Sequence, residues 1–514
     1  MSLDLLQKDW DAVIIGTGMG GGTLGRVLAE GGLKVLFIEK GPTGHRSERQ
    51  ALHSDIFTPD ARALRGFWPT PLRAKIDGRD SEFFAPLGAG IGGSSAFYAA
   101  TLERPERHDM DDHPHAQWPV SYDEMAPWYD KAEALFHVCG AADPLSSETQ
   151  ADLKTPPALD ASDAALMEEM KTCGLHPYRL HSAIQYVAGC HDCLGKKCPK
   201  TCKMDGRSAG VEPALATGNA GLLTNAEVTS LETRDREISA IHIRYDGTIH
   251  RLAAKRVILA AGALGSAHLM LASDPKGLAN SSGLVGRNLM FHLNEMFALW
   301  PKAKISGSEA SKTISLRDLY HQTGQRFGTI QSMGIGAGYG EILHYLRLML
   351  SRSPLRKLPL SNDLARIPAA FAVKMLGNAK VFVGLLEDYG YPENRVTYDP
   401  ENSDHLHIEY TIAPELKSRR KAFRKAIRQA FRRHRKLFLS MQPELNFGHP
   451  CGTLRFGGDP KTSVLDRTCK THDLDNLWVV DSSFMPSSFG VNPSLTIAAN
   501  ALRVGDHLLK EART

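Results

Sequence analysis

Short, unbroken runs of apolar residues next to glycine-rich turns mark the first part of the chain. Ala12–Ile15 and Val35–Ile38 have the length and continuous apolar character of strands buried on both faces in a parallel sheet. Between them, Leu24, Val27 and Leu28 recur at helical spacing. The pattern therefore predicts a strand–turn–helix–strand unit.

The turn of this unit carries the glycine spacing of a nucleotide-binding site. Gly16, Gly18 and Gly21 form G-x-G-x-x-G directly after the first strand, and Glu39 ends the second strand. The first glycine permits the tight turn, the second lets a pyrophosphate approach the backbone, and the third lets helix and strand pack closely. The helix N-terminus faces the phosphates, and Glu39 can accept hydrogen bonds from a ribose. The unit predicts a dinucleotide site and leaves NAD and FAD open.

Later segments repeat the strand-and-turn pattern. Val257–Ala261 is a buried apolar run that leads through a glycine-containing turn into a helix. Leu477–Val480 is another such run, which ends at Asp481, and a helix begins at residues 493–494. Residues 290–445 mix strand-like runs with long helical ones, which predicts a second, α+β domain inserted into the first.

Other segments have weaker patterns. Residues 43–80 contain three prolines and predict irregular structure. Leu222–Thr233 and Ala240–Asp246 predict strands. Ser121, followed three residues later by Glu124, predicts a capping box at the start of an amphipathic helix.

Composition limits the classes of protein that the chain can represent. Its 514 residues, 42% of them hydrophobic, suffice for two or more domains with a large core. A net charge of +4 gives no general case for nucleic-acid binding. The sequence has no apolar run of 18 residues, and residues 1–10 lack the pattern of a secretory signal. We therefore expect a cytoplasmic protein, with the periplasm open only to a chain exported together with a partner.

Four of the eight cysteines lie within thirteen residues, although the chain is too poor in cysteine to be a disulfide scaffold. Cys190, Cys193, Cys198 and Cys202 have the spacing C-x₂-C-x₄-C-x₃-C, which is neither the common ferredoxin run nor a zinc-finger spacing. Such thiolates can hold an iron–sulfur cluster or a zinc ion, form disulfides after export, or remain free. The other cysteines are predicted to be buried small residues.

A strongly basic stretch follows in the inserted region. Lys417–Lys436 contains eleven Lys or Arg and no acidic residue, while Phe423, Ile427 and Phe431 recur every four residues. This pattern predicts an amphipathic helix whose basic face is solvated or docks to anionic lipid or an acidic partner. Residues 342–377 are also basic and apolar, which is typical of a lid over a cavity or of a membrane-facing patch.

The N-terminal unit and three further motifs together resemble the glucose–methanol–choline (GMC) family of flavin oxidoreductases over nearly the whole chain. Gly92-Gly93-Ser94-Ser95 is similar to the first family signature, and residues 257–273 are similar to the second. His449 stands in H-x-x-G-T and Asn492 in N-P-S-L-T-I, the positions of the family's catalytic pair. The C-terminal segment is most similar to gluconate and glucose dehydrogenase large subunits, and Phe489–Thr496 also resembles cholesterol oxidase.

The resemblance implies an α/β fold in which a Rossmann-type FAD-binding domain carries an inserted α+β substrate domain. Residues 1–130, 205–290 and 446–514 would form the FAD-binding domain, residues 131–204 a connecting segment with the Cys cluster, and residues 291–445 the substrate domain. The implied cofactor-binding residues are Gly16, Gly18, Gly21, Glu39, Gly92, Gly93, Ser94, Ser95, Val228, Asp481 and Asn492. Phe97 and Tyr98 stand where members with covalent flavin carry a histidine, so we expect noncovalent FAD.

The family's chemistry is the oxidation of an alcohol at its CH–OH carbon. His449 would take the hydroxyl proton, Asn492 would orient the substrate oxygen, and a hydride would pass to flavin N5. The substrate class stays open among sugars, polyols, sterols and other hydroxy compounds. We expect an electron acceptor other than oxygen, such as a quinone, a cytochrome or another subunit. Two alternatives are an oxygen-using oxidase of the same fold and a flavin-binding electron-transfer subunit without turnover.

The Cys group also has a counterpart in this resemblance. Cys193, Cys198 and Cys202 keep the spacing of three cysteines that hold an iron–sulfur cluster in the catalytic subunits of FAD glucose dehydrogenases, and Cys190 lies slightly farther out. The resemblance thus implies FAD with an iron–sulfur cluster as a second cofactor, beside the zinc, disulfide and free-thiol alternatives.

Overall fold

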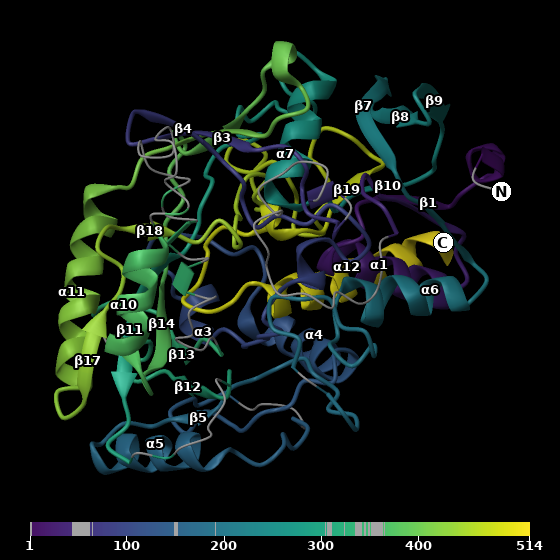
Figure 1. The fold of residues 1–514 in the computed structure, drawn as a ribbon. Helices are drawn as coiled ribbons and strands as arrows, with labels where there is room; N and C mark the ends of the chain where they lie inside the picture. The colour runs from purple at the N-terminus through teal and green to yellow at the C-terminus, as the bar shows by residue number, and fades with distance from the viewer. Residues whose placement is uncertain are drawn as a thin grey trace.

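The computed structural model describes most of the chain (Figure 1). The described residues are 3–43, 65–148, 153–190, 192–303, 311–322, 324–334 and 365–513, together with residues 62, 63, 305, 342, 343, 346, 347, 350 and 363.

A parallel sheet forms the centre of the nucleotide-binding part. In the described residues it has five strands in the order β19-β10-β1-β2-β6, and every neighbouring pair runs parallel. Each strand is short, and the three central ones are buried along their whole length. The Rossmann-type α/β fold is thereby confirmed. The strands are β1 (Ala12–Ile15), β2 (Val35–Ile38), β6 (Ala220–Leu223), β10 (Val257–Leu259) and β19 (Leu477–Val479).

The strand order changes direction at β1, and this determines where a ligand can bind. The chain passes from β1 to β2 on one side, and β10 later adds on the other side. In such sheets a crevice opens beyond the carboxyl ends of the strands at the point of reversal. Gly16 follows β1, Glu39 follows β2, Ala260 follows β10 and Asp481 lies two residues beyond β19, so all four stand at this edge.

Helices cover one face of the sheet, with α1, α6 and α12 below it in the view of Figure 1. Glycine allows close packing there: a Cβ on Gly25 would lie 2.1 Å from the Phe37 ring, and one on Gly505 would lie 2.9 Å from Val27. The capping box of Ser121 and Glu124 is confirmed at the start of α4. The helices of the nucleotide-binding part, on this face and elsewhere, are α1 (Met19–Glu30), α4 (Tyr122–Leu135), α6 (Glu212–Ala216), α7 (Gly262–Ser273) and α12 (Ser494–Arg513).

Two small sheets correct weak sequence interpretations. Residues 43–80 were expected to be irregular, but they contain a hairpin of β3 (Leu72–Ile76) and β4 (Arg79–Phe83). Strand β3 also pairs with β16 (His407–Tyr410), and β15 (Arg395–Thr397) completes this sheet. Residues 44–61 and 64 lie outside the described part. Leu222–Thr233 is divided between β6 and β7 (Ala226–Arg234), because Asn225 takes a left-handed conformation with φ 54°. Strand β7 forms an antiparallel sheet with β8 (Glu237–Tyr245) and β9 (Thr248–Leu252).

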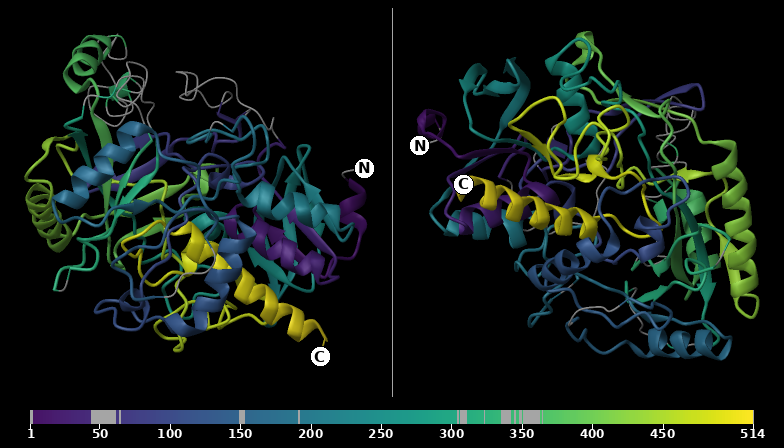
Figure 2. Two further views of the ribbon diagram at one scale, coloured as in Figure 1. Left: turned by 90° about the horizontal axis from the view of Figure 1, so that it is seen from below. Right: turned by 180° about the vertical axis from the view of Figure 1, so that it is seen from behind.

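A larger antiparallel sheet makes up the other half of the molecule (Figure 2). Its described strands run in the order β17-β11-β14-β13-β12-β5, and β18 pairs with another part of β11. They are β5 (Tyr178–Arg179), β11 (Leu293–Trp300), β12 (Ile314–Leu316), β13 (Ile330–Ser332), β14 (Lys380–Leu386), β17 (Arg435–Phe438) and β18 (Glu444–Leu445). Two further helices are α3 (Arg107–Met110) and α5 (Ala161–Thr172).

The basic stretch is a helix over only part of the expected range. Helix α11 (Pro414–Ala430) ends before Lys436, and Arg435–Phe438 forms β17 against β11 instead. Phe423 and Ile427 bury the apolar face, as expected. Arg420 forms an ion pair with the buried Glu295 at 2.8 Å, and Arg424 pairs with the same carboxylate. This part of the basic face therefore points into the protein.

A buried ion network lies where β12 ends. Arg317 is 0% exposed and donates to Glu103 at 2.8 Å and to Glu106 at 2.9 Å. The Tyr178 hydroxyl also donates to Glu103 at 2.9 Å. The network joins the antiparallel sheet to residues 103–106 of the nucleotide-binding part.

No helix in the described part of the chain has both the length and the apolar character needed to cross a membrane. Much of the expected lid or patch at residues 342–377 lies outside the described residues. Its described end is α10 (Arg366–Leu376), on which Ile367 is 73% exposed and Phe371 70% exposed.

Candidate active site

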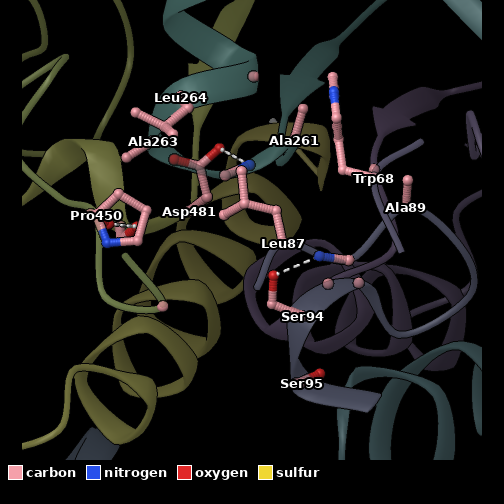
Figure 3. A pocket seen from close by; sticks show the side chains of 18 of the residues that line it. Trp68, Leu87, Ala89, Ser94, Ser95, Ala261, Ala263, Leu264, Pro450 and Asp481 are labelled. Carbon is pink, nitrogen blue, oxygen red and sulfur yellow. Dashed lines mark hydrogen bonds between the residues drawn. The ribbon is translucent and has the colours of Figure 1, made fainter. Parts of the chain in front are cut away.

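A cavity of about 680 Å³ opens at the carboxyl edge of the parallel sheet and extends toward the antiparallel sheet. Its lining includes Glu39 and Val228 at one end and His449 and Asn492 at the other. Figure 3 shows the middle of the cavity, where Ser94, Ala261 and Asp481 line it from three different segments. The topology therefore brings together residues that are far apart in the sequence.

The three glycines of the first turn have different surroundings. Gly16 has φ +104°, and a Cβ there would lie 2.4 Å from the Ala260 carbonyl oxygen. A Cβ on Gly21 would lie 2.3 Å from the Gly16 carbonyl oxygen. Gly18, by contrast, has nothing within 4 Å of its Cβ position and lines the cavity. Gly16 and Gly21 thus permit the close turn, while Gly18 leaves space beside the N-terminus of α1.

Glu39 is a buried carboxylate that organises this turn. It accepts hydrogen bonds from the Thr17 hydroxyl at 2.5 Å, from the Thr17 N–H at 3.2 Å and from the Gly41 N–H at 3.0 Å. Burial raises the pKa of Glu39, and these donors oppose the rise. The Thr17 hydroxyl oxygen also accepts a hydrogen bond from the Gly92 N–H at 3.2 Å, so Thr17 links the first turn to the second glycine-rich loop. Sequence reasoning missed Thr17, because the x positions of G-x-G-x-x-G carry no chemical signal.

The second glycine-rich loop contributes two serines with different tasks. Ser94 Oγ accepts the Gly88 N–H at 2.9 Å beside the cavity (Figure 3). Ser95 Oγ donates to the Gly92 carbonyl at 2.5 Å and accepts the Gly206 N–H at 2.9 Å, so it mainly holds the loop. Gly92 and Gly93, with φ +91° and +52°, provide the left-handed backbone that this turn needs.

Asp481 joins the ends of β10 and β19. Its Oδ2 accepts the Gly262 N–H at 3.0 Å, drawn in Figure 3, and the Ser266 hydroxyl at 2.5 Å, while Oδ1 accepts the Ser483 N–H at 2.9 Å. Burial raises the pKa of Asp481, and these hydrogen-bond donors partly oppose the rise. The residue therefore fixes the start of α7 as well as lining the cavity.

His449 lies in the loop after β18, at the end of the cavity that faces the antiparallel sheet. Its Nδ1 is 3.2 Å from Nδ1 of His292 and 3.2 Å from the Asn446 amide nitrogen. Burial, with the positive charges that His292 and Lys312 can carry, lowers the pKa of His449 well below its usual value. His292 Nε2 is 3.1 Å from the Phe489 carbonyl oxygen, and burial lowers the pKa of His292 to about 4. Both rings are therefore neutral at neutral pH.

Asn492 lines the same end of the cavity, just before α12. Gln331 Nε2 on β13 donates to Asn492 Oδ1 at 2.8 Å, so the Asn492 amide nitrogen is the group left to face a ligand. The sequence singled out both His449 and Asn492, and the structure places them around one cavity. His292, Gln331 and Lys312 were missed, because they lie outside any motif and reach the site through the pairing of the antiparallel sheet.

The Cys loop packs against the cavity. Cys202 Sγ is 3.4 Å from Cys198 Sγ and 3.6 Å from Cys190 Sγ, and all four of these cysteines are unbridged. The Lys203 ammonium, 0% exposed, donates to the Cys193 and Ala96 carbonyls, each at 3.0 Å. This one side chain ties the Cys loop to the loop that carries Ser94 and Ser95.

The thiols differ in acidity. Burial alone would raise the pKa of Cys198. The backbone N–H groups of Lys203 and Lys200 donate to its sulfur and outweigh burial, so the pKa of Cys198 lies below its usual value. Burial raises the pKa of Cys193 to about 11, and that of Cys202 further. Thiolate ligands suit soft metal centres, and among Cys193, Cys198 and Cys202 the thiol of Cys198 is the most ready to ionise.

These features fit FAD. Open space at Gly18 beside a helix N-terminus suits a pyrophosphate, and Glu39 closes the end of the cavity that suits a ribose. Gly262 likewise has nothing within 4 Å of its Cβ position, so backbone alone lines the middle of the cavity there. Val228 lines the end beside Glu39.

Comparison with known proteins gives one consistent family. Models described as GMC oxidoreductase match residues 11–294 and 391–501. The chain is 28% identical to 6‴-hydroxyparomomycin C oxidase of Streptomyces lividus, over 97% of this chain and 91% of that protein. It is 25% identical to the fructose dehydrogenase large subunit of Gluconobacter japonicus, over 98% of each. The crystal structure of pyridoxine 4-oxidase from Mesorbium loti has a similar fold, with a TM-score of 0.65, 20% identity and coverage of 97% and 99%.

Proposed function

The chain belongs to the GMC oxidoreductase family of FAD-dependent enzymes that act on alcohol CH–OH groups, and from this premise we propose the roles of its own residues. His449 is the general base that takes the hydroxyl proton, and Asn492 orients the substrate oxygen. The observation that carries this assignment is their position around the end of one cavity, beyond the residues that fit FAD. Bound FAD supplies the acceptor for the hydride that leaves the same carbon.

The neighbours of His449 support a base at Nε2. His292 Nε2 faces a carbonyl oxygen, which only accepts, so neutral His292 carries its proton there and presents a lone pair at Nδ1. A hydrogen bond between the two Nδ1 atoms then places the His449 proton on Nδ1. The Asn446 N–H is directed at the same atom and competes with this arrangement. In the tautomer that His292 favours, His449 Nε2 keeps the free lone pair that accepts a proton.

Gln331 gives Asn492 a defined orientation. Because the Gln331 N–H occupies Asn492 Oδ1, the Asn492 amide N–H groups remain to donate to the substrate oxygen. A donor at this point stabilises negative charge on the oxygen as the proton leaves. The assignment is tested by anaerobic mixing with a panel of alcohols, in which at least one must bleach the flavin absorbance of the parent protein.

We further propose noncovalent FAD and an acceptor other than oxygen. Phe97 stacks on Phe67 with ring centroids 4.0 Å apart, and Tyr98 donates to the Met204 carbonyl, so both side chains of this loop are used in packing. Acid precipitation should release the yellow chromophore into the supernatant, whereas colour kept in the pellet contradicts the proposal. Oxygen uptake with peroxide formation at the rate of alcohol oxidation would instead identify an oxidase.

The Cys group is proposed to hold an iron–sulfur cluster through Cys193, Cys198 and Cys202. Support comes from the donor type and from the position: Gly195 of the same loop lines the cavity, and Lys203 anchors the loop beside it. When bound, such a cluster supplies an outlet for single electrons. Iron and acid-labile sulfide should be found in protein purified without oxygen. Zinc without iron, or two thiols fewer per bridge on titration, would identify the zinc or disulfide alternative.

A peripheral membrane contact is proposed through α10. Ile367 and Phe371 are exposed one turn apart on this helix, and Lys374 adds a positive charge near its end. Protein incubated with vesicles of anionic lipid should sediment with them, and the double variant I367S/F371S should stay in the supernatant. Equal sedimentation of parent and variant contradicts this contact.

A further inference from the structure

Phe489 has a backbone conformation that its residue type rarely adopts. It is fully buried and has φ +60°, in the left-handed region where the Cβ of an L-residue crowds the following carbonyl oxygen. Among the described residues it is the only phenylalanine, tyrosine or tryptophan with a positive φ. Such residues persist only where their surroundings hold them, and they gather at functional sites. Phe489 lies three residues before Asn492, so its conformation bears on the substrate end of the cavity.

The carbonyl oxygen of Phe489 faces the ring of His292. His292 Nε2 lies 3.1 Å from this oxygen, and His292 is 0% exposed. A carbonyl oxygen only accepts hydrogen bonds, so the neutral His292 ring carries its proton on Nε2. Nδ1 of His292 is then an acceptor, and it lies 3.2 Å from Nδ1 of His449. The direction of one main-chain carbonyl therefore determines what the proposed base meets at Nδ1.

Trp118 holds Phe489 from one side. The two rings are stacked, with centroids 4.7 Å apart and an angle of 17° between their planes. Trp118 Nε1 also donates to the hydroxyl oxygen of Ser487 at 2.9 Å, two residues before Phe489. Trp118 is itself buried, so both contacts are made inside the protein core. Together they oppose rotation of Phe489 out of the left-handed conformation.

Ser488 connects the same segment to the backbone beside His292. Its hydroxyl accepts the Asp388 N–H at 2.9 Å and donates to the Asp388 carbonyl oxygen at 3.1 Å. The carboxylate of Asp388 accepts the N–H of Phe291, the residue before His292, at 3.0 Å. Ser488 and Asp388 are both buried. The Phe489 carbonyl and the His292 ring are therefore held relative to each other through one pair of side chains.

From this arrangement we propose that Phe489 is a positioning residue for the proton transfer: its left-handed backbone presents the carbonyl that fixes the tautomer of His292 and, through it, that of His449. Trp118 and Ser488 keep this carbonyl in place. The proposal rests on the assignment of His449 as the general base. None of Phe489, Trp118 and Ser488 belongs to the described cavity lining, so their replacement leaves the side chains that face a ligand unchanged.

Two variants remove the same ring and differ in the backbone conformation that they tolerate. F489G can keep the left-handed conformation without strain, whereas F489A should relax to a negative φ and turn the carbonyl away from His292. F489A should therefore reduce the flavin about 3- to 10-fold more slowly than F489G, the range for one lost hydrogen bond. Stopped-flow mixing measures the two rates, and thermal melting shows that both variants are folded.

The tautomers are measured by NMR of the ring nitrogens in protein with isotope-labelled histidine, and H292F and H449A assign the signals. In the parent and in F489G, His292 should carry its proton on Nε2 and His449 on Nδ1, while F489A should show a mixture. In the H292F background, F489G and F489A should reduce the flavin at equal rates, because the path through His292 is gone. A merely structural role of Phe489 would leave the difference between them in place.

S488A tests the connection to Asp388 without changing the aromatic pair, and it carries the test if a Phe489 variant does not fold. It should slow flavin reduction about 3- to 10-fold in the parent and cause no further loss in H292F. The matched control is S463A, which removes a buried serine hydroxyl with two hydrogen bonds outside the cavity lining and should react at the parental rate.

Two results would overturn the proposal: equal rates and tautomers in F489A and F489G, or an S488A effect that persists in H292F. H449A separates this failure from that of the base itself. If H449A is slow while F489A and F489G react equally, only this inference fails. If H449A reduces the flavin at the parental rate, the assignment of the base fails, and this inference fails with it.

Discussion

The Nδ1 atoms of His292 and His449 lie 3.2 Å apart, with the two rings nearly perpendicular at 83°. His292 is fully buried and is held from its other side by the Phe489 carbonyl. The pair therefore provides a fixed partner for the ring that we assign as the base. Replacing His292 by phenylalanine should slow flavin reduction about 3- to 10-fold, the range for one lost hydrogen bond. Stopped-flow reduction measures this, and an unchanged rate would show that His292 does not position the base.

Replacing His449 should slow flavin reduction more than replacing His292. The variant H449A should retain FAD and reduce it about 10²- to 10⁴-fold more slowly, the usual range for loss of a general base. H507A, which removes a histidine 45% exposed on α12, is the matched control and should reduce the flavin at the parental rate. Parental kinetics in H449A would show that another group takes the proton.

The pH dependence follows from the lowered pKa of His449. The base works in its neutral form, so a lowered pKa keeps it active at acidic pH, and the rate of flavin reduction should stay level from pH 8 down to 6.5 and fall only below that. In K312M, loss of the neighbouring positive charge should raise the pKa of His449 and move this fall to higher pH. A parental midpoint at or above 6.5 would contradict the assignment.

Glycine variants separate cofactor binding from folding. G18A adds a methyl group toward the cavity and should weaken FAD binding at least about tenfold without changing the stability of the apoprotein. G20A should instead destabilise the fold by about 1–3 kcal/mol, because its Cβ would lie 2.0 Å from the Val480 carbonyl oxygen. G458A, in open space, is the control for both. Flavin fluorescence on titration and thermal melting of apoprotein give the two readouts, and unaltered FAD affinity in G18A would contradict the pyrophosphate assignment.

The Arg317 network should contribute strongly to stability. R317M leaves the carboxylates of Glu103 and Glu106 buried without their partner and should cost about 3–5 kcal/mol of unfolding free energy. R251M breaks an exposed pair with Glu232 and should leave the unfolding midpoint unchanged. Urea unfolding measures both, and a small effect of R317M would show that the two acids take up protons in the variant.

Local patterns were enough to predict the nucleotide-binding part. Short apolar runs and the glycine spacing predict that the first two strands end at Gly16 and Glu39, and these patterns lie within about 30 residues of each other. The confirmed capping box at Ser121 and Glu124 has an even shorter range. Such elements are predictable because the interactions that determine them involve neighbours in the sequence.

Long-range pairing explains what the sequence did not reveal. Arg435–Phe438 continues a helical pattern but forms a strand, because Phe438 pairs with Phe297 on β11. Lys312 and Gln331 reach the cavity through the register of β12 and β13, and no local spacing encodes that register. The side chains at this end of the cavity could therefore not be predicted from local sequence patterns.

The order of the parallel sheet has a consequence for biosynthesis. β1 pairs with β10, whose first residue lies 242 positions beyond the last residue of β1, and β10 pairs in turn with β19. At a translation rate of roughly 5–20 residues per second, the nascent β1 waits about 10 to 50 seconds for this neighbour. During that time the edge of β1 that will pair with β10 is open, and such an unpaired edge can pair with other chains. Because Asp481 and Asn492 emerge later still, the flavin cavity is completed only near the end of synthesis.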